Sequence, residues 1–199
     1  SGESRDVHVV IPEDLEPGAP VVFFFHGLLD PNSTPNPASY MASALNMQSM
    51  ADETGTVIVL PVSPTMSEFG MSFFMWDVME SSDTDLVLFD DLRTCISNEL
   101  QVDLSRLALM GFSGGSLFAT TLARERSDTI ATIVEMSGGA DIDVPIYENT
   151  LSRYETPSWE MPMLLISGGD SDAWPDASFT LVNFTEATDT LQANRTADG

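Results

Sequence analysis

Short runs of apolar residues recur along the chain, each bounded by Gly, Pro, Ser or Asp, and they predict buried strands. The run PVVFFFHG at 20–27 is apolar almost throughout, which is typical of a strand buried on both faces of a sheet. The run DVHVVIP at 6–12 ends at a proline and predicts an edge strand. The remaining predicted strands are 56–62, 106–112, 129–139 and 161–169.

Between these strands, apolar residues recur at spacings of three and four, which predicts amphipathic helices. The clearest helical segment is 83–100, where the apolar face consists of Leu86, Phe89, Leu92, Ile96 and Leu100. Further helices are predicted at 38–53, 115–126 and 177–194. This alternation predicts an α/β fold, in which a mostly parallel sheet carries helices on both faces.

Length and composition favour one domain that spans residues 1–199, because 43% hydrophobic content suffices for one sizeable core. No segment approaches the ~20 apolar residues that a membrane-spanning helix needs. No basic and apolar leader opens the chain, so we expect a signal peptide to be absent or already removed. The single cysteine, Cys95, is either a small buried residue of a helix or the partner of a cysteine elsewhere.

The chain is strongly acidic, with 31 acidic residues, seven arginines, no lysine and a net charge of −24. Such a surface repels a phosphate backbone, so nucleic acid is not an expected partner. The acidic residues are scattered along the chain, which indicates a solvated acidic surface rather than an acidic tail.

The stretch LALMGFSGGSLFA at 107–119 carries the clearest chemical signal, a G-x-S-x-G pattern centred on Ser113. It lies where a strand is predicted to turn sharply into a helix, which is the setting of the nucleophile elbow of α/β-hydrolases. Glycine flanks the serine on both sides because side chains there would clash in so tight a turn. Ser113 is therefore the predicted nucleophile.

An acyl-transfer site also needs donors for the oxyanion that forms during the reaction. The predicted donors are the backbone N–H of Gly114 and that of Leu28 or Leu29, which follow the His26-Gly27 pair. We interpret His26 as a residue that orders this loop rather than as the catalytic base. His26 and His8 both precede the serine, whereas the triad of this fold runs in the order Ser, acid, His.

The triad acid is predicted in the stretch LLISGGDSDAWPD, where a strand ends and several aspartates follow. We favour Asp172 over Asp170 as the carboxylate that orients a histidine. The Asp-x-Asp pair lacks the glycine and the closing glutamate of a calcium loop, so no metal is expected. No cofactor is implied either.

These motifs together resemble the polyhydroxyalkanoate depolymerase and feruloyl or acetylxylan esterase group of α/β-hydrolases. The resemblance covers residues 20–190, and VDLSRLALMGFSGGSLFATTLA is its most specific piece. It implies an ester hydrolase of the cell envelope or the secreted fraction, with a small or polymeric ester as substrate and no cofactor. It also implies that Ser113 and Asp172 are catalytic, and that Asp90, Asp91, Asp103 and Arg106 belong to the scaffold.

In esterases of this group the catalytic histidine follows the last helix and one further strand. No histidine follows Asp172 in these residues. We therefore expect the domain to be incomplete at its C-terminus, without its last strand and its histidine loop, and the 199-residue chain to be nearly inactive. Two alternatives stay open at this point. One is an inactive binding protein that keeps the fold, and the other is a peptidase of the same fold.

The stretch MSEFGMSFFMWDVMES at 66–81 is rich in methionine and aromatic residues within a predicted long loop. It could pack beneath that loop as a satellite of the core. Alternatively, it could form the apolar floor of a substrate site, since methionine adapts to ligands of varied shape. The candidate substrate-binding residues are Phe74, Met75 and Trp76.

Overall fold

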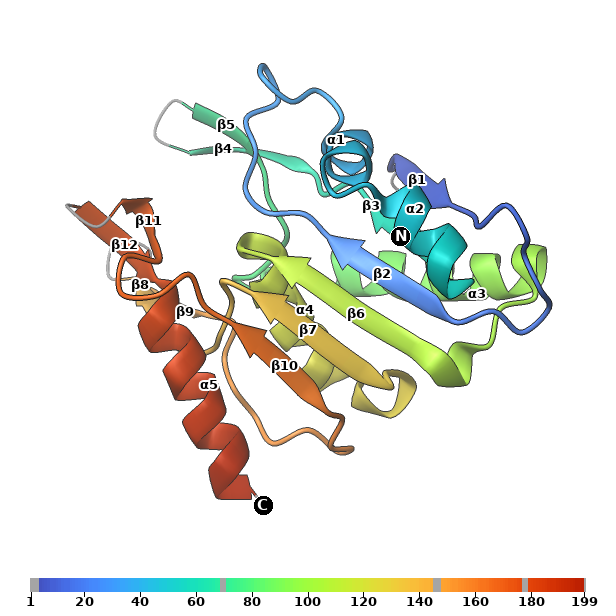
Figure 1. Ribbon diagram of the computed structural model, residues 1–199. Coiled ribbons are helices and arrows are strands. Elements are labelled where there is room, and N and C mark those ends of the chain that lie inside the picture. Colours follow the sequence, from blue (N-terminus) through green and yellow to red (C-terminus); the bar gives the residue numbers. More distant parts are fainter. Residues whose placement is uncertain (1–3, 69–70, 145–147, 177–178, 199) are drawn as a thin grey trace.

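The computed structural model describes residues 4–68, 71–144, 148–176 and 179–198. Its centre is a six-stranded sheet in the order β1–β3–β2–β6–β7–β10 (Figure 1). The strand β1 is antiparallel to β3, and the other neighbours run parallel. The bounds are Val7–Val10, Val57–Pro61, Val21–Phe25, Leu107–Phe112, Thr132–Met136 and Met163–Ile166, in sheet order. The predicted mostly parallel α/β sheet is confirmed.

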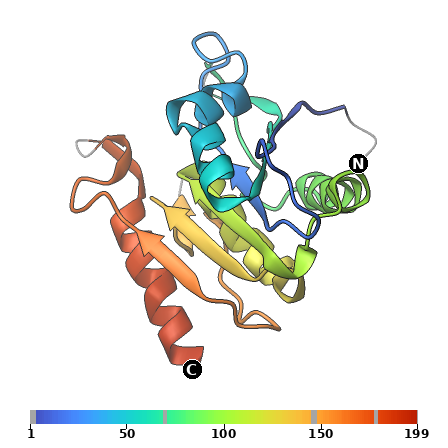
Figure 2. The same ribbon diagram turned by 45° about the vertical axis from the view of Figure 1, so that its right-hand side comes forward.

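Helices cover both faces of this sheet, as the alternation of elements predicts (Figure 2). On one face α1 (Pro37–Ala44) and α2 (Met47–Thr54) pack against β1 and β3. On the other face, buried residues of α3 (Thr84–Leu100), α4 (Gly114–Glu125) and α5 (Phe184–Asp198) join one apolar cluster. Single 3-10 turns lie at Leu104–Arg106 and Ser127–Thr129. None of the helices in the described ranges combines the length and the apolar character needed to cross a membrane.

Three two-stranded hairpins follow the carboxyl ends of central strands. The hairpin β4–β5 (Thr65–Glu68, Met71–Phe74) follows β3, and β8–β9 (Ile142–Val144, Asn149–Leu151) follows β7. The third, β11–β12 (Ala173–Asp176, Phe179–Asn183), follows β10. Ligands bind at the carboxyl edge of parallel sheets in α/β proteins. These hairpins therefore build walls at the edge where a site is expected.

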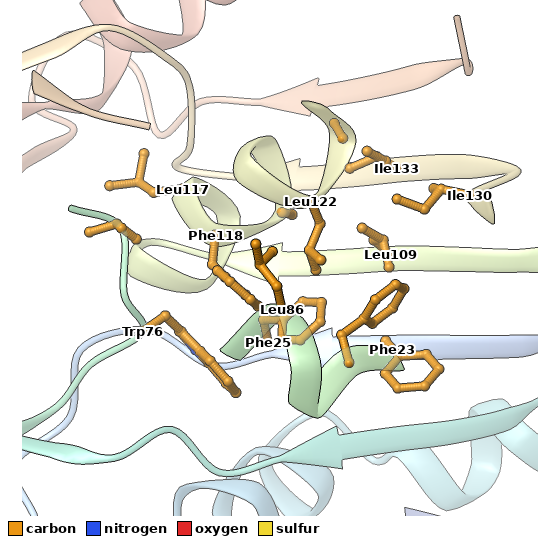
Figure 3. Close-up of a cluster of buried hydrophobic side chains, with 14 of the residues drawn as sticks. Phe23, Phe25, Trp76, Leu86, Leu109, Leu117, Phe118, Leu122, Ile130 and Ile133 are labelled. Atoms are coloured by element: carbon orange, nitrogen blue, oxygen red, sulfur yellow. The ribbon is translucent and has the colours of Figure 1, made fainter. Parts of the chain in front are cut away.

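The largest apolar cluster lies between the sheet and α3 and α4 (Figure 3). Its aromatic centre consists of Phe25, Trp76 and Phe118. The rings of Trp76 and Phe118 stack with centroids 5.1 Å apart, and Phe25 meets Trp76 edge-on at 5.2 Å. Trp76 is only 1% exposed. The structure thus places Trp76 in the main core, not on the surface of a loop.

The opposite face of the sheet loses its cover toward β10. Register aligns Phe24, Met110, Val134 and Leu164 in one row across β2, β6, β7 and β10. Phe24 is fully buried, whereas Leu164 is 56% exposed. Ile166, which also lies in β10, is 45% exposed. Figure 1 shows this face of β7 and β10 without a helix in front of it. The β10 end of this row is therefore left open to solvent.

Two predicted helices differ from the structure. The predicted helix 38–53 is two helices, because Asn46 adopts a left-handed conformation (φ 49°) between them. The predicted helix 177–194 is wrong in its first part, since β12 ends at Asn183 and α5 begins only at Phe184. Pairing with β11 holds the run of β-forming residues in an extended conformation there.

Two further sequence interpretations also change. The predicted loop 66–81 contains the hairpin β4–β5, whereas Phe69 of this stretch lies outside the described residues. Cys95 is exposed on α3, so its interpretation as a small buried residue is wrong.

Candidate active site

Ser113 occupies the turn between β6 and α4 with backbone angles of φ 54° and ψ −121°. Residues other than glycine rarely adopt a positive φ, and such strain is often found at functional sites. The turn is held by hydrogen bonds, because the Ser113 N–H donates to the carbonyl of Met136 (2.9 Å). The Ser113 carbonyl in turn accepts from the N–H groups of Ser116 and Leu117 at the start of α4. The strand–serine–helix elbow predicted from the sequence is therefore present.

The two glycines around the serine are explained by contacts with backbone. A β-carbon on Gly111 would lie 2.6 Å from the backbone of Gly115 and Ser116. A β-carbon on Gly115 would lie 2.0 Å from the carbonyl oxygen of Phe25. Helix α4 can approach the sheet this closely only because neither residue has a side chain.

The loop after β2 lies directly against the elbow. A β-carbon on Gly27 would lie 3.0 Å from the β-carbon of Ser113, and one on Gly114 would lie 3.8 Å from the backbone nitrogen of Leu28. The backbone of Leu28 and that of Gly114 thus meet beside the serine. Leu29 lies one residue further, and its carbonyl accepts from the N–H of Phe74 (2.8 Å). Of the two leucines, Leu28 is the one placed next to Gly114.

His26 is fixed beneath this loop by backbone partners on both ring nitrogens. Its Nδ1 lies 2.8 Å from the carbonyl of Gly27, and its Nε2 accepts from the N–H of Ser63 (3.2 Å). These partners define a neutral ring with the proton on Nδ1. Burial lowers the pKa of His26 to about 4, although the hydrogen bond to Gly27 acts in the opposite direction. His26 is 1% exposed and is a structural residue of the loop.

The indole of Trp76 extends the same scaffold, since its Nε1 donates to the carbonyl of His26 (2.9 Å). His8 lies in β1, and β3 and β2 separate it from the strand that carries Ser113. His26 is thus hydrogen-bonded at both ring nitrogens, and His8 is remote from Ser113. Neither histidine is placed to take the serine proton.

Asp172 lies in the turn after β10, at the same edge of the sheet as Ser113. The strand β7 lies between β6 and β10, and the Ser137 N–H of its following loop donates to the carbonyl of Ile166 (2.8 Å). The carboxylate of Asp172 accepts from the N–H of Gly168 (2.7 Å) and is half-buried. Asp170 is exposed and faces an open groove. Of the two aspartates, Asp172 is thus the one that is partly buried and hydrogen-bonded within the turn.

A cavity of about 90 Å³ opens at Ser113. Its described walls come from the loop after β2, the elbow and the three hairpins, and among these lining residues Ser113 supplies the single hydroxyl group. The lining residues are Leu28, Met66, Phe73, Met75, Val78, Ser113, Gly114, Leu117, Val144, Leu151, Trp174, Leu181, Val182 and Phe184. Of the candidate substrate-binding residues, Met75 lines the cavity, whereas Phe74 and Trp76 are buried elsewhere.

The hairpin residues Trp174, Leu181 and Val182 were not anticipated as part of a site. The sequence signal for them is the apolar run that follows the aspartate turn. The spacing of apolar residues in this run also fits a helix, and the sequence therefore predicts a helix there. The scaffold residues Asp103 and Arg106 form a salt bridge (3.0 Å) at the turn that leads into β6. Asp90 of α3 pairs with Arg126 at the end of α4 (3.0 Å).

The sheet order, the serine elbow and the acid turn define a protein with the α/β-hydrolase fold. Comparison with known proteins supports this class. The chain is 32% identical over 140 residues to the bifunctional acetylxylan esterase/xylanase XynS20E of Neocallimastix patriciarum. This match covers 69% of the chain and 18% of that protein, so the chain spans less than a fifth of its curated relative.

Solved structures share the fold over most of the chain. The crystal structure of native sOPH has a TM-score of 0.70 at 18% identity, covering 95% of this chain and 72% of that one. An S-formylglutathione hydrolase from Agrobacterium tumefaciens has a TM-score of 0.63 at 19% identity, covering 92% and 76%. No family model matches the chain. The resemblance to esterases of this fold that the sequence indicates is confirmed.

Proposed function

We propose that these residues form the nucleophile-bearing part of a serine hydrolase that cleaves carboxylic esters. The observation that carries the proposal is the position of Ser113, at a strained elbow in the wall of an apolar cavity and beside the backbone of Leu28 and Gly114. The esterase relative supports the same class of reaction.

In the proposed mechanism, Oγ of Ser113 attacks the ester carbonyl carbon and forms a tetrahedral intermediate. The N–H groups of Leu28 and Gly114 donate to its oxyanion, and His26 and Trp76 keep the Leu28 loop in place. The alcohol leaves, and water then releases the acyl group from the serine. Asp172 orients the histidine that transfers the protons.

We further propose that this histidine comes from polypeptide outside residues 1–199. The occupied ring nitrogens of His26 and the remote position of His8 support this assignment. Among the described strands, none pairs with the outer edge of β10, which offers a place for another strand, and the exposed Leu164 and Ile166 offer an apolar surface to cover. A segment that pairs there would end at the carboxyl edge of the sheet, near Asp172.

The substrate that this cavity favours is an ester with a neutral, apolar acyl group. No charged side chain is among its described lining residues, so a charged acyl group would lose its hydration without a partner. Esters of hydroxy acids, phenolic acids or acetylated polymers fit this description. For a polymeric ester we place the protein outside the cytoplasm, and its net charge of −24 disfavours nucleic acid as a partner.

The experiment is hydrolysis of p-nitrophenyl acetate and butyrate by a form of the protein that extends beyond Gly199, compared with Ser113→Ala. We expect Ser113→Ala to abolish turnover and labelling by an alkyl fluorophosphonate, and the exposed Ser43→Ala to leave both unchanged. Removal of the triad serine costs roughly 10⁶ in turnover in another serine hydrolase. An adduct at a different serine would exclude Ser113 as the nucleophile.

Three further variants test the finer assignments. A histidine-to-alanine change in the added segment should abolish hydrolysis, whereas His26→Ala should impair it through loss of loop order and lower stability. Trp174→Ala should change the ratio of butyrate to acetate turnover, because Trp174 lines the cavity. Fast turnover by the 199-residue chain itself would refute an external base.

A further inference from the structure

Glu135 is a buried carboxyl group that the proposed mechanism does not use. It lies in β7 beneath α4, is 1% exposed, and directly precedes Met136. Met136 forms three hydrogen bonds to the elbow. Its carbonyl accepts from the Ser113 N–H (2.9 Å) and from the Ser116 hydroxyl (3.0 Å), and its N–H donates to Oγ of Ser116 (2.9 Å). Any movement at this end of β7 is therefore passed to the nucleophile.

The contacts of Glu135 can all be satisfied only when its carboxyl group carries a proton. The two short contacts of Thr120 Oγ1 are with Oε1 of Glu135 (2.8 Å) and with the carbonyl oxygen of Gly139 (3.0 Å), while the carbonyl oxygen of Ser116 lies at 3.5 Å, the limit of a hydrogen bond. A hydroxyl has one proton, so with a carboxylate one of these two contacts would lack a hydrogen. A protonated Oε1 donates to Thr120, which then donates to Gly139, while Oε2 accepts from the Gly139 N–H (3.0 Å).

Among the described residues, the surroundings of Glu135 include no positively charged group to pair with a carboxylate. Helix α4 presents Ser116 and Thr120, the following loop presents Gly138 and Gly139, and α5 reaches this loop through Thr188. Burial raises the pKa of Glu135 to about 8, although hydrogen bonds that Thr120 and Gly139 would donate to a carboxylate act in the opposite direction. An uncharged acid at neutral pH agrees with the proton count.

The loop at 137–140 connects this carboxyl group to the acid turn as well. The Thr188 hydroxyl donates to the carbonyl of Gly138 (3.2 Å), and the Ala140 N–H donates to the carbonyl of Ala187 (3.2 Å). At the start of the same helix, the Phe184 N–H donates to the carbonyl of Asp172 (2.9 Å). The loop thus lies between the elbow of Ser113 and the helix that holds Asp172.

We propose that Glu135, as an uncharged carboxylic acid, is a positioning residue that holds loop 137–140 against α4. It thereby fixes the positions of Ser113 and Asp172 relative to each other. This role rests on the proposed ester hydrolysis. Loss of the proton leaves one contact without a hydrogen and places a charge among uncharged neighbours. The loop then shifts, and turnover falls while the nucleophile and the acid are both still present.

The protonation state is tested on the 199-residue chain without any need for activity. Infrared spectra at pH 6 should show the carbonyl stretch of a protonated carboxylic acid, which fades as the pH is raised past 8. The band should be absent in Glu135→Gln and present in the exposed control Glu99→Gln. Identical spectra for wild type and Glu135→Gln at pH 6 would overturn the proposal.

The positioning role is tested on the extended, active form by the pH dependence of kcat. In the wild type, kcat should fall about tenfold per pH unit above the pKa of Glu135. Glu135→Gln, whose amide mimics the acid, should keep the kcat of the wild type at pH 6 and lose the alkaline decline. Glu99→Gln should behave as the wild type. Superimposed profiles of the wild type and Glu135→Gln would refute the role.

A second pair of variants covers the case in which Glu135→Gln does not fold. Thr120→Ser keeps the hydroxyl and should keep kcat at pH 6, whereas Thr120→Val removes it and should lower kcat with little change in KM. Equal kcat values for these two variants would refute the proposal. If the wild type hydrolyses no ester, the proposed function fails, while the infrared result still decides the state of Glu135.

Discussion

Replacing Gly115 with alanine should destabilise the chain strongly, because this residue lies in the first turn of α4 against β2. A β-carbon there would lie 2.0 Å from the carbonyl oxygen of Phe25 and 2.6 Å from that of His26, whereas ordinary contacts begin at 3.4 Å. The obstructing atoms belong to the backbone at the end of β2, which pairs with β3 and β6. Neither the strand nor the helix can withdraw without disturbing the elbow.

Overpacking a close-packed interior costs roughly 1–3 kcal/mol and occasionally more. We expect Gly115→Ala to fall at the upper end, with a loss of about 3 kcal/mol in the free energy of unfolding. For a domain of this size, that loss lowers Tm by about 6–12 °C. Urea unfolding followed by circular dichroism measures the free energy, and calorimetry measures Tm.

Gly114→Ala is the matched control for this substitution. The atom nearest to its new β-carbon is the backbone nitrogen of Leu28 at 3.8 Å, which is an ordinary contact. Alanine is favoured over glycine within helices by about 1 kcal/mol, so this variant should be neutral or slightly more stable. If Gly115→Ala were as stable as Gly114→Ala, the close approach of α4 to β2 would be refuted.

Three other outcomes are expected. Asp172→Asn should lower kcat of the extended form far more than Asp170→Asn, by up to about 10⁴ as in a related triad, and equal small losses would exclude this turn. Wild-type stability should fall as pH rises from 6.5 toward 8 by roughly 1.4 kcal/mol per unit, because in this range Glu135 is ionised in the unfolded chain but still protonated in the folded one. Glu135→Gln should lack this slope in pH-dependent urea unfolding, and parallel curves would contradict burial of the charge. Tm should rise between low and molar sodium chloride, since ~1 M salt shortens the screening length to about 3 Å, and a flat curve would mean that the acidic residues do not repel one another.

The parts of the structure that the sequence predicts are those with a strong local cause. The central strands are predicted because burial on both faces demands uninterrupted apolar runs, such as 21–25. The elbow is predicted because Gly111 and Gly115 are required by contacts that any such turn must make. Ser113 and the adjacent backbone of Gly114 follow from that turn alone.

The parts that the sequence does not predict depend on contacts between distant segments. The run 179–183 becomes a strand because β11 pairs with it, although its apolar residues also fit a helical spacing. Trp76 is drawn into the core because Phe25 and Phe118 meet its ring, whereas its neighbour Met75 reaches the cavity. Composition cannot distinguish these two positions, since both residues are apolar and adjacent.

The buried ring of His26 determines how the oxyanion loop responds to acid. Its pKa in the folded chain is about 4, below the ordinary value of 6.5, so the unfolded chain takes up this proton first. Folding stability is therefore lost as pH falls from 6.5 toward 4, by up to about 3 kcal/mol.

A proton that does enter the folded ring must bind Nε2, where it would oppose the N–H of Ser63. Acid thus acts on the loop that holds Leu28, whereas alkali acts on Glu135 beneath the elbow. Together, His26 and Glu135 are both in the uncharged state that the site requires only at mildly acidic to neutral pH. We therefore expect the carboxyl edge of the sheet to be fully ordered in that pH range.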